Sequence, residues 1–475
     1  MSMFTLAQAA QAIPGSRVHG AADTAFERVS TDSRGTGPGD VFFALKGERF
    51  DAHDFLDEVA ARGVTAVVAT HVPAGYPVPA LVVDNTLQAL QALARAWRRG
   101  FSLPLAAVTG SNGKTTVKEM ISAIFAAAVG ENRRLATRGN LNNEIGVPLT
   151  LFRLAAEQAL AVVELGMNHP GETALLSSIA EPTIALVNNA QREHQEFMAT
   201  VEAVALEHAS VIEALPADGV AVFPADDAYV AVWRRAAGAR RRIEFALGTG
   251  GADVGIADVV GTPFADGRVA VTTPVGNFEF KLQVLGEHNV RNALAATGVA
   301  LAAQVDLEAI RAGLEAFEPV KGRLQVKTAQ CAPLTGATVI DDTYNANPDS
   351  MRAAIAVLAR YASPRVLIIG DMGEVGDHGP EFHREIGDYA RERGVDAIYA
   401  LGDASVAAVT AFGPAARHFD SVEALLKALL ASGLESSATL LVKGSRFMRM
   451  ERAVEALLAS APMKSDVPGM RPGTH

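Results

Sequence analysis

Cysteine is almost absent from this chain of 475 residues, in which Cys331 is the only one. A single thiol excludes an internal disulfide bond and a thiol-rich metal site. A catalytic thiol stays open as an alternative, but we expect Cys331 to be a buried residue without a role in chemistry.

Long apolar runs are absent as well, since no stretch approaches the roughly 18 residues that cross a membrane. The chain begins Met-Ser-Met-Phe-Thr-Leu-Ala-Gln, without the basic cluster that opens a signal peptide. We therefore expect a cytoplasmic protein that has no membrane span.

Positive charge is in deficit, because 42 Lys and Arg residues face 53 Asp and Glu residues, for a net charge of −11. A nucleic-acid-binding protein needs a basic face, so this class is disfavoured. An anionic small molecule is not excluded, because a local cluster of donors is enough to bind it. We also expect a monomer.

The length exceeds what one hydrophobic core serves, and alternating strand and helix patterns predict an α/β protein of three domains. We expect a small α/β domain over residues 1–84 and a central doubly wound parallel sheet with an antiparallel flap over residues 85–318. A Rossmann-like domain should follow over residues 319–462. Residues 463–475 should form a disordered tail.

A strand, a glycine-containing loop and a helix are predicted around residues 103–118. Such a loop directs backbone N–H groups at phosphates, Lys114 adds a positive charge, and the Thr115 hydroxyl can contact Mg²⁺. The following helix points its positive end at the same anion. A plain glycine-rich turn is the alternative, but all parts of the pattern agree on an ATP site.

The loop departs from the common GxxxxGK[ST] pattern, because Val108 stands at the usual glycine and Gly110 replaces it. This short form resembles the loop of the Mur ligase and folylpolyglutamate synthase superfamily rather than that of kinases or GTPases. The resemblance implies that ATP is bound by Thr109, Gly110, Ser111, Asn112, Gly113, Lys114, Thr115 and Thr116.

Two candidate metal ligands follow strands of the central sheet. Glu164 ends an apolar strand, and open α/β sheets place ligands at that end. A carboxylate there suits Mg²⁺, with a capped or ion-paired glutamate as the alternative. A single histidine such as His194 is more often structural. The resemblance nevertheless implies that Glu164, His194 and Thr115 hold Mg²⁺, and that Lys114, His194 and Arg323 are catalytic.

One departure from the family concerns a lysine that becomes carbamoylated and supports a second Mg²⁺ in many members. An ungapped comparison places His208 at that position, and no lysine occurs between Lys118 and Lys281. A carbamate in this region is therefore excluded. We expect His208, Glu207 or a water molecule to take its place, or a second metal to bind more weakly.

Three polar segments extend the resemblance across the chain. Residues 137–148 form an Asn- and Gly-rich loop, which could be a plain turn by composition but matches the segment that holds the UDP-linked sugar. Asn289 and Asn292 lie three apart on a predicted helix, where helix capping is the alternative. Arg323 follows a predicted linker, where a solvated arginine is the alternative.

The third domain contains the segment Asp341-Asp-Thr-Tyr-Asn-Ala-Asn-Pro-Asp-Ser350, in which a turn and a helix cap explain only Asn347 and Pro348. Together with residues 370–376 and 442–446, it resembles the family member that adds D-alanyl-D-alanine to UDP-N-acetylmuramoyl-tripeptide. The Asp-Asn-Pro-Arg motif of the diaminopimelate-adding relative is absent from the sequence.

The resemblance implies further binding residues for these substrates. The adenine and ribose of ATP should contact Asn289, Asn292 and Asp342. The ATP phosphates should contact Arg323. The UDP-sugar should contact Ser33, Arg34, Lys46, Thr137, Asn140, Asn142 and Asn143. The dipeptide should contact Tyr344, Asn345 and Asn347.

Two other functions stay open. A folylpolyglutamate-synthase-like ligase would share the loop and the domain order but should lack a uridine-binding first domain. A non-ligase ATPase or kinase would need no dipeptide. The third residue of the tripeptide, diaminopimelate or lysine, is not determined by the sequence, and neither is the open or closed arrangement of the domains.

Overall fold

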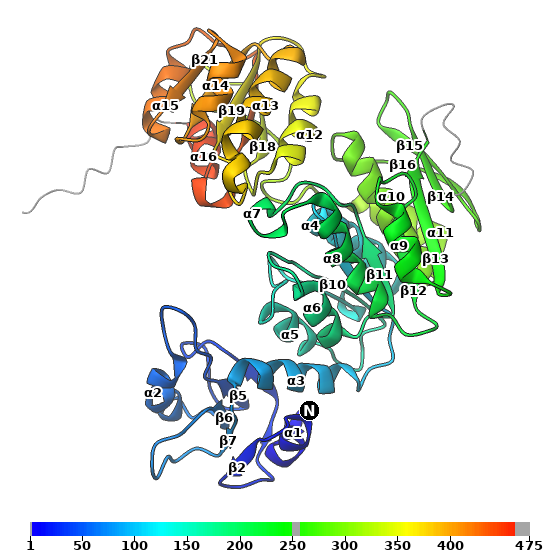
Figure 1. Cartoon of the computed structure of the whole chain (residues 1–475), viewed down its shortest axis with the longest axis vertical. Helices are drawn as coiled ribbons and strands as arrows, with labels where there is room; N and C mark the ends of the chain where they lie inside the picture. Colours follow the sequence, from blue (N-terminus) through cyan, green and yellow to red (C-terminus); the bar gives the residue numbers. More distant parts are fainter. Residues whose placement is uncertain (1, 249–256, 461–475) are drawn as a thin grey trace, which may run out of the picture. The chain divides into compact units, whose positions relative to one another are not determined.

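The computed structural model describes residues 2–248 and 257–460 (Figure 1). The chain forms two compact units. Unit 1 comprises Met1–Ala190, Glu202–Leu282 and Val290–Phe317, and unit 2 comprises Gln191–Val201, Gln283–Asn289 and Glu318–His475. Two short segments from the middle of the sequence, residues 191–201 and 283–289, thus belong to the unit that holds the C-terminal domain.

The first sheet has five strands in the order β2-β7-β6-β5-β4, and only β2 runs antiparallel to its neighbour. Phe42 and Phe43 are neighbours on β5, so their side chains enter different cores on the two faces of the sheet. The elements of this region are β1 (Phe4–Thr5), α1 (Leu6–Ala12), β2 (Arg17–His19), β3 (Ala25–Phe26), β4 (Arg28–Ser30), β5 (Asp40–Phe43), α2 (Leu56–Ala61), β6 (Ala66–Ala69), β7 (Ala80–Val82) and α3 (Thr86–Arg98).

The second sheet has nine strands in the order β16-β15-β14-β13-β12-β11-β8-β10-β9. Strands β8 to β14 run parallel, whereas β14, β15 and β16 are antiparallel. The strands are β8 (Leu105–Thr109), β9 (Arg134–Ala136), β10 (Leu160–Glu164), β11 (Ile184–Val187), β12 (Val220–Pro224), β13 (Arg241–Leu247), β14 (Val259–Pro263), β15 (Arg268–Thr273) and β16 (Gly276–Lys281).

Every residue of β8, β10, β11 and β12 is buried, as expected for parallel strands in the interior of a doubly wound sheet. The helices of this region are α4 (Lys114–Val129), α5 (Gly146–Leu151), α6 (Glu172–Ala180), α7 (Gln195–Met198), α8 (Val201–Glu213), α9 (Val230–Ala237), α10 (Glu287–Ala302) and α11 (Leu307–Ala316).

The edge strands β14, β15 and β16 confirm the expected antiparallel flap. The β14–β15 turn contains Asp266 and Gly267, and Gly267 has a positive φ of 85° that favours glycine. Burial alternates along β15, as it does in a strand with one face in water. Part of the predicted flap, residues 249–256, lies outside the described residues.

The third sheet has six strands in the order β17-β18-β22-β19-β20-β21, of which only β17 is antiparallel to its neighbour. Its strands are β17 (Gln325–Thr328), β18 (Thr338–Asp342), β19 (Arg365–Gly370), β20 (Ala397–Leu401), β21 (Ala416–Phe419) and β22 (Thr439–Lys443). Its helices are α12 (Pro348–Leu358), α13 (Gly379–Glu392), α14 (Val406–Phe412), α15 (Val422–Leu430) and α16 (Glu451–Leu458).

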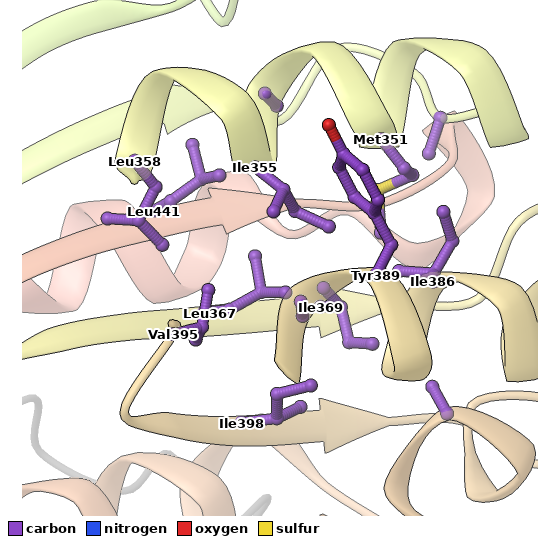
Figure 2. Close-up of a cluster of buried hydrophobic side chains, with 14 of the residues drawn as sticks. Met351, Ile355, Leu358, Leu367, Ile369, Ile386, Tyr389, Val395, Ile398 and Leu441 are labelled. Atoms are coloured by element: carbon purple, nitrogen blue, oxygen red, sulfur yellow. The ribbon is translucent and has the colours of Figure 1, made fainter. Parts of the chain in front are cut away.

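Helices α12 and α13 cover one face of this sheet. Figure 2 shows Ile355 of α12 and Ile386 of α13 gathered over Leu367 and Ile369 of β19. Both helices thereby have fixed positions within unit 2, and the positions of their polar side chains are fixed with them.

The three α/β sheets confirm the predicted fold class. The strand, loop and helix predicted around residues 103–118 are β8, the loop that follows it and α4, and the apolar strand predicted before Glu164 is β10. The domain boundaries at residues 84 and 318 stay predictions. The predicted tail, residues 463–475, lies outside the described residues.

Candidate functional site

The predicted phosphate-binding loop lies between the end of β8 and the start of α4. Gly110 has a φ of 131°, and a Cβ there would lie 3.0 Å from the backbone nitrogens of Asn188 and Asn189. Gly113 has a φ of 83°, and a Cβ there would lie 2.6 Å from Asn292 Oδ1. Both glycines are therefore required by backbone conformation and by close packing.

Asn188 and Asn189, directly after β11, hold this loop in place. The Asn188 and Asn189 side-chain amides donate to the Asn112 carbonyl over 2.8 and 2.9 Å. In return, Asn189 accepts hydrogen bonds from the N–H groups of Ser111 and Asn112 over 3.1 and 2.9 Å. These two N–H groups are directed at Asn189, so their contact with phosphate stays a prediction.

Lys114 is the first residue of α4, and its ammonium group folds back on the loop. Its Nζ donates to the Gly110 carbonyl over 2.6 Å and to the Ser111 carbonyl over 3.3 Å. Thr116, the third residue of α4, is buried. The lysine charge thus lies beside the loop residues that the sequence assigned to phosphate binding.

Glu164 ends β10 as predicted and is only 2% exposed. Its Oε1 accepts hydrogen bonds from Thr115 Oγ1 over 3.2 Å and from Asn142 Nδ2 over 2.8 Å. Its Oε2 is buried and has no hydrogen-bond partner among residues 2–248 and 257–460. A buried carboxylate oxygen of this kind beside a threonine hydroxyl fits a divalent cation, because an unpaired buried charge is otherwise costly.

The loop after β9 also contacts Glu164. The Thr137 hydroxyl is buried and accepts the backbone N–H of Glu164 over 2.9 Å. Asn143 Oδ1 accepts the N–H of Gly146 over 2.8 Å at the start of α5, whereas Asn140 is exposed. The structure therefore brings Thr137 and Asn142 to the predicted metal ligand, and contacts of these residues with a sugar stay predictions.

Glu207 and His208, the proposed substitutes for the family's lysine, are both engaged on α8. Glu207 accepts the backbone N–H groups of Gly171 and Thr173 over 2.9 and 2.8 Å, at the start of α6. His208 is fully buried, and its Nδ1 lies 2.9 Å from Thr109 Oγ1. Both side chains therefore stabilise the protein's own elements.

Asn289 and Asn292 on α10 are both buried. Asn289 Nδ2 donates to the Leu285 carbonyl over 2.7 Å, one turn before it. Asn292 Oδ1 accepts from Asn188 Nδ2 over 2.9 Å, which connects α10 to the residues that hold the phosphate-binding loop. A contact of either residue with adenine stays a prediction.

His194 lies in unit 2, at the start of the four-residue helix α7. Its backbone has a φ of 48°, and its Nδ1 lies 2.7 Å from Glu374 Oε2. Thr115 and Glu164 belong to unit 1. The predicted metal ligands are thus divided between the two units.

A second polar cluster lies in unit 2, at the carboxyl ends of β18 and β22. Asp342 Oδ2 pairs with Lys443 Nζ at 2.7 Å, and Lys443 also donates to the Asn345 carbonyl over 2.8 Å. Burial raises the pKa of Asp342, and the Lys443 charge opposes that rise. The Arg323 guanidinium lies 4.2 Å from the centre of the Tyr344 ring.

Asn347 forms a capping box at the start of α12, where its Oδ1 accepts the Ser350 N–H over 2.8 Å. Asn345 is exposed next to it. The local alternative of a turn and a cap is therefore confirmed for Asn347, while contacts of Tyr344, Asn345 and Asn347 with a dipeptide stay predictions.

The candidate uridine-binding residues lie in the first sheet region. The Arg34 guanidinium pairs with Asp32 over 2.8 Å, and Ser33 lies between them in the sequence. Lys46 is exposed and lies 3.4 Å from Asp51. Asp51 is hydrogen-bonded by His53, which lowers the pKa of Asp51 to about 2. Binding of uridine here stays a prediction.

The sequence did not single out Asn188, Asn189 and Lys443 as functional residues. A signal existed for all three, because each follows or ends a buried parallel strand, where ligands of open α/β sheets bind. Cys331 is partly buried, and burial raises the pKa of its thiol. That direction opposes a reactive thiolate.

Two further properties bear on the site. Among residues 2–248 and 257–460, no three His, Cys, Asp or Glu side chains gather in a metal-binding group. A cation at Glu164 would therefore need hydroxyl, phosphate or water oxygens as further ligands.

Every helix in the described part of the chain is too short or too polar to cross a membrane.

Comparison with known proteins places three segments in one family. Residues 25–98 match the Mur ligase family catalytic domain, residues 108–300 match the Mur ligase middle domain, and residues 322–446 match the Mur ligase glutamate ligase domain. The chain is 39% identical over 440 residues to the UDP-N-acetylmuramoyl-tripeptide–D-alanyl-D-alanine ligase of Escherichia coli strain K12, covering 92% of this chain and 94% of that protein.

Solved structures agree. The MurF crystal structure from Acinetobacter baumannii matches with a TM-score of 0.88 at 36% identity, covering 96% of this chain and 98% of that one. The MurF ligase from Thermotoga maritima in complex with ADP matches with a TM-score of 0.78 at 27% identity, covering 91% and 97%. The three family-model matches, the relatives and the fold together show that this chain belongs to the Mur ligase family.

Proposed function

We propose that this protein is an ATP-dependent ligase that joins D-alanyl-D-alanine to UDP-N-acetylmuramoyl-tripeptide, a step in the synthesis of peptidoglycan precursors. Relatives named for this activity match over more than nine-tenths of the chain. The observation in the structure that supports the chemistry is the buried Glu164 carboxylate beside the hydroxyl of Thr115, the residue that directly follows Lys114.

The proposed reaction has two steps. An oxygen of the tripeptide's terminal carboxylate attacks the γ-phosphorus of ATP, the bond to the β-phosphate oxygen breaks, and ADP leaves. The dipeptide amine then attacks the carbonyl carbon of the acyl phosphate, loses a proton, and displaces phosphate from the tetrahedral intermediate. The products are the amide, ADP and phosphate.

Within this scheme Lys114 neutralises charge on the phosphoryl group and the attacking carboxylate. Such charge neutralisation by preorganised groups is a large part of phosphoryl-transfer catalysis. Asn188 and Asn189 hold the loop that directly precedes Lys114, which helps to fix the start of the helix that carries the ammonium group.

Thr115 and Glu164 are the residues that would hold Mg²⁺, which supplies further charge neutralisation at the phosphates when bound. His194, in unit 2, stays a predicted ligand. Arg323, Asp342, Asn289 and Asn292 stay predicted ATP contacts. We also propose that the protein acts in the cytoplasm, where ATP is available.

One experiment separates this function from its alternatives. Phosphate release is measured with ATP, Mg²⁺ and UDP-N-acetylmuramoyl-tripeptide, with and without D-alanyl-D-alanine, and the pentapeptide product is identified by mass. We expect release that depends on both substrates. Release without the dipeptide would favour an ATPase or a kinase, and activity with a folate and glutamate in their place would favour the folylpolyglutamate-type ligase.

Lys114→Ala tests the catalytic role proposed for this lysine. Its ammonium group donates to the carbonyls of its own loop, so the variant should fold. Loss of the charge should lower kcat by about 10²–10³-fold. A decrease of less than ten-fold would contradict the role proposed for this lysine.

A further inference from the structure

Residues 191–201 connect β11 to α8 in the sequence, yet they pack with the C-terminal domain in unit 2. We call these residues the crossing segment. It carries His194, a predicted metal ligand. The contacts that hold this segment in place therefore bear on the proposed reaction. The side chain of Arg192 contacts residues of both α12 and α13.

Arg192 is held by two carboxylates at once. Its Nη2 lies 2.6 Å from Asp349 Oδ1, and its Nη1 lies 2.6 Å from Glu385 Oε2. Its backbone N–H also donates to Asp349 Oδ2 over 2.9 Å. The planar guanidinium satisfies both acids with separate N–H groups, a geometry that a lysine cannot reproduce.

The partners of Arg192 are themselves rigidly placed. Asp349 lies in the first turn of α12, where a negative charge is favoured by the helix dipole. Glu385 lies on α13, and hydrogen bonds from Arg192 lower the pKa of that carboxyl. The Arg192 guanidinium also lies 5.3 Å from the centre of the Phe382 ring. Arg192 thereby fastens the crossing segment to two helices that share one core.

Two residues further on, the segment adopts a conformation that needs support. His194 and Ala199 have φ values of 48° and 55°, which are unusual for residues other than glycine. The Glu196 N–H donates to the Glu374 carbonyl over 3.3 Å, and His194 Nδ1 lies 2.7 Å from the Glu374 carboxylate. Left-handed backbone persists only where the surrounding contacts impose it.

We propose that Arg192 is a positioning residue, which holds the crossing segment on the C-terminal domain and thereby fixes the orientation of His194 for the ligase reaction. The catalytic part of this proposal rests on the proposed function above. The mechanical part rests only on the contacts of Arg192, Asp349 and Glu385 and is measured separately.

The mechanical part is tested by hydrogen exchange in the full-length protein without substrates. Arg192→Ala should raise amide exchange over residues 193–200 about ten-fold or more, because it removes two charge-assisted contacts. Arg192→Lys should give an intermediate rate. Exchange over residues 386–390, inside α13, should stay as in the wild type.

Arg352→Ala is the matched control. Arg352 of α12 shares the Glu385 carboxylate, with Nη1 3.0 Å from Oε1, and stacks on Tyr389, and both of these partners lie on α13. It should leave exchange over residues 193–200 unchanged. Unchanged exchange in Arg192→Ala, or an equal increase in Arg352→Ala, would overturn the proposal.

The catalytic part is tested by the dependence of the ligase rate on Mg²⁺ concentration. Arg192→Ala should lower kcat about ten-fold and raise the Mg²⁺ concentration at half-maximal rate, while Arg192→Lys recovers part of both. The KM for ATP should change less than kcat. Faster exchange with unchanged kinetics would overturn the positioning role. A wild-type protein without ligase activity would instead overturn the proposed function and leave the exchange result standing.

Discussion

His208 is the residue at which this chain departs most clearly from the expectation that its family resemblance raised. Both His208 and Glu207 make hydrogen bonds to neighbouring elements. His208 contacts Thr109 at the end of β8, and Glu207 accepts the Gly171 N–H at the start of α6. The His208–Thr109 contact joins α8 to the last residue of β8, directly before the phosphate-binding loop. A residue that could have served a metal is thus engaged in holding the loop.

This assignment predicts a measurable coupling between His208 and Thr109. Either His208→Ala or Thr109→Val should lower the free energy of unfolding by about 1–3 kcal/mol, because each removes this buried hydrogen bond. The double variant should cost less than the sum of the two. Urea denaturation of the four proteins measures the coupling, and strictly additive losses would show that the contact contributes nothing.

At the scale of elements, α11 packs closely against α4, the helix that begins at Lys114. A Cβ on Gly313 of α11 would lie 2.3 Å from Ile124 Cα of α4, so only glycine permits this distance between the two helices. The position of α4 on the sheet therefore depends on a residue far from the loop. Sequence patterns did not indicate this, because an isolated glycine in a helix has several explanations.

Gly313→Ala should therefore lower the free energy of unfolding by about 1–3 kcal/mol, since the added methyl group forces α11 away from α4. Gly35→Ala is the matched control, because nothing lies within 4 Å of a Cβ at that position, and it should change stability by less than about 0.5 kcal/mol. Denaturant unfolding measures both. Equal stability of the two variants would mean that the helices adjust without cost.

On the scale of the whole molecule, two compact units make unfolding in more than one step the natural expectation. His288, in unit 2, should make the stability of that unit depend on pH. Burial lowers the pKa of His288 to about 4, and the positive charges of Lys443 and Arg360 act in the same direction. The unfolded chain, with an ordinary histidine pKa near 6.5, therefore binds more protons between these two values.

Because the unfolded state takes up the proton first, stability falls as the pH is lowered from about 6.5 towards 4. Between pH 7 and pH 5 the loss should be about 2 kcal/mol in the transition of unit 2. His288→Gln should remove most of that pH dependence, whatever its stability at pH 7. Scanning calorimetry at both pH values, with hydrogen exchange to assign the transitions, measures it. An unchanged slope in His288→Gln would refute the assignment.

The sequence predicted well whatever depends on short stretches of chain. The apolar run before Gly110 and the Lys114–Thr115 pair located β8, the loop and the start of α4, because these signals lie within one turn of each other. Glu164 was placed correctly at the end of β10 for the same reason. Asn188 and Asn189 were missed, since two asparagines after a strand are equally typical of a turn.

Fold class and family could thus be predicted from the sequence alone, because hydrophobic period, glycine position and motif spelling are local properties. Which side chains meet depends on the three-dimensional packing of distant segments. The order β11-β8-β10 brings Asn188 and Glu164 to either side of the loop, and the packing of residues 191–201 on α12 and α13 brings Arg192 to its two acids. Such contacts join residues that are about 20 to 190 positions apart, and no local pattern encodes a pairing over that distance.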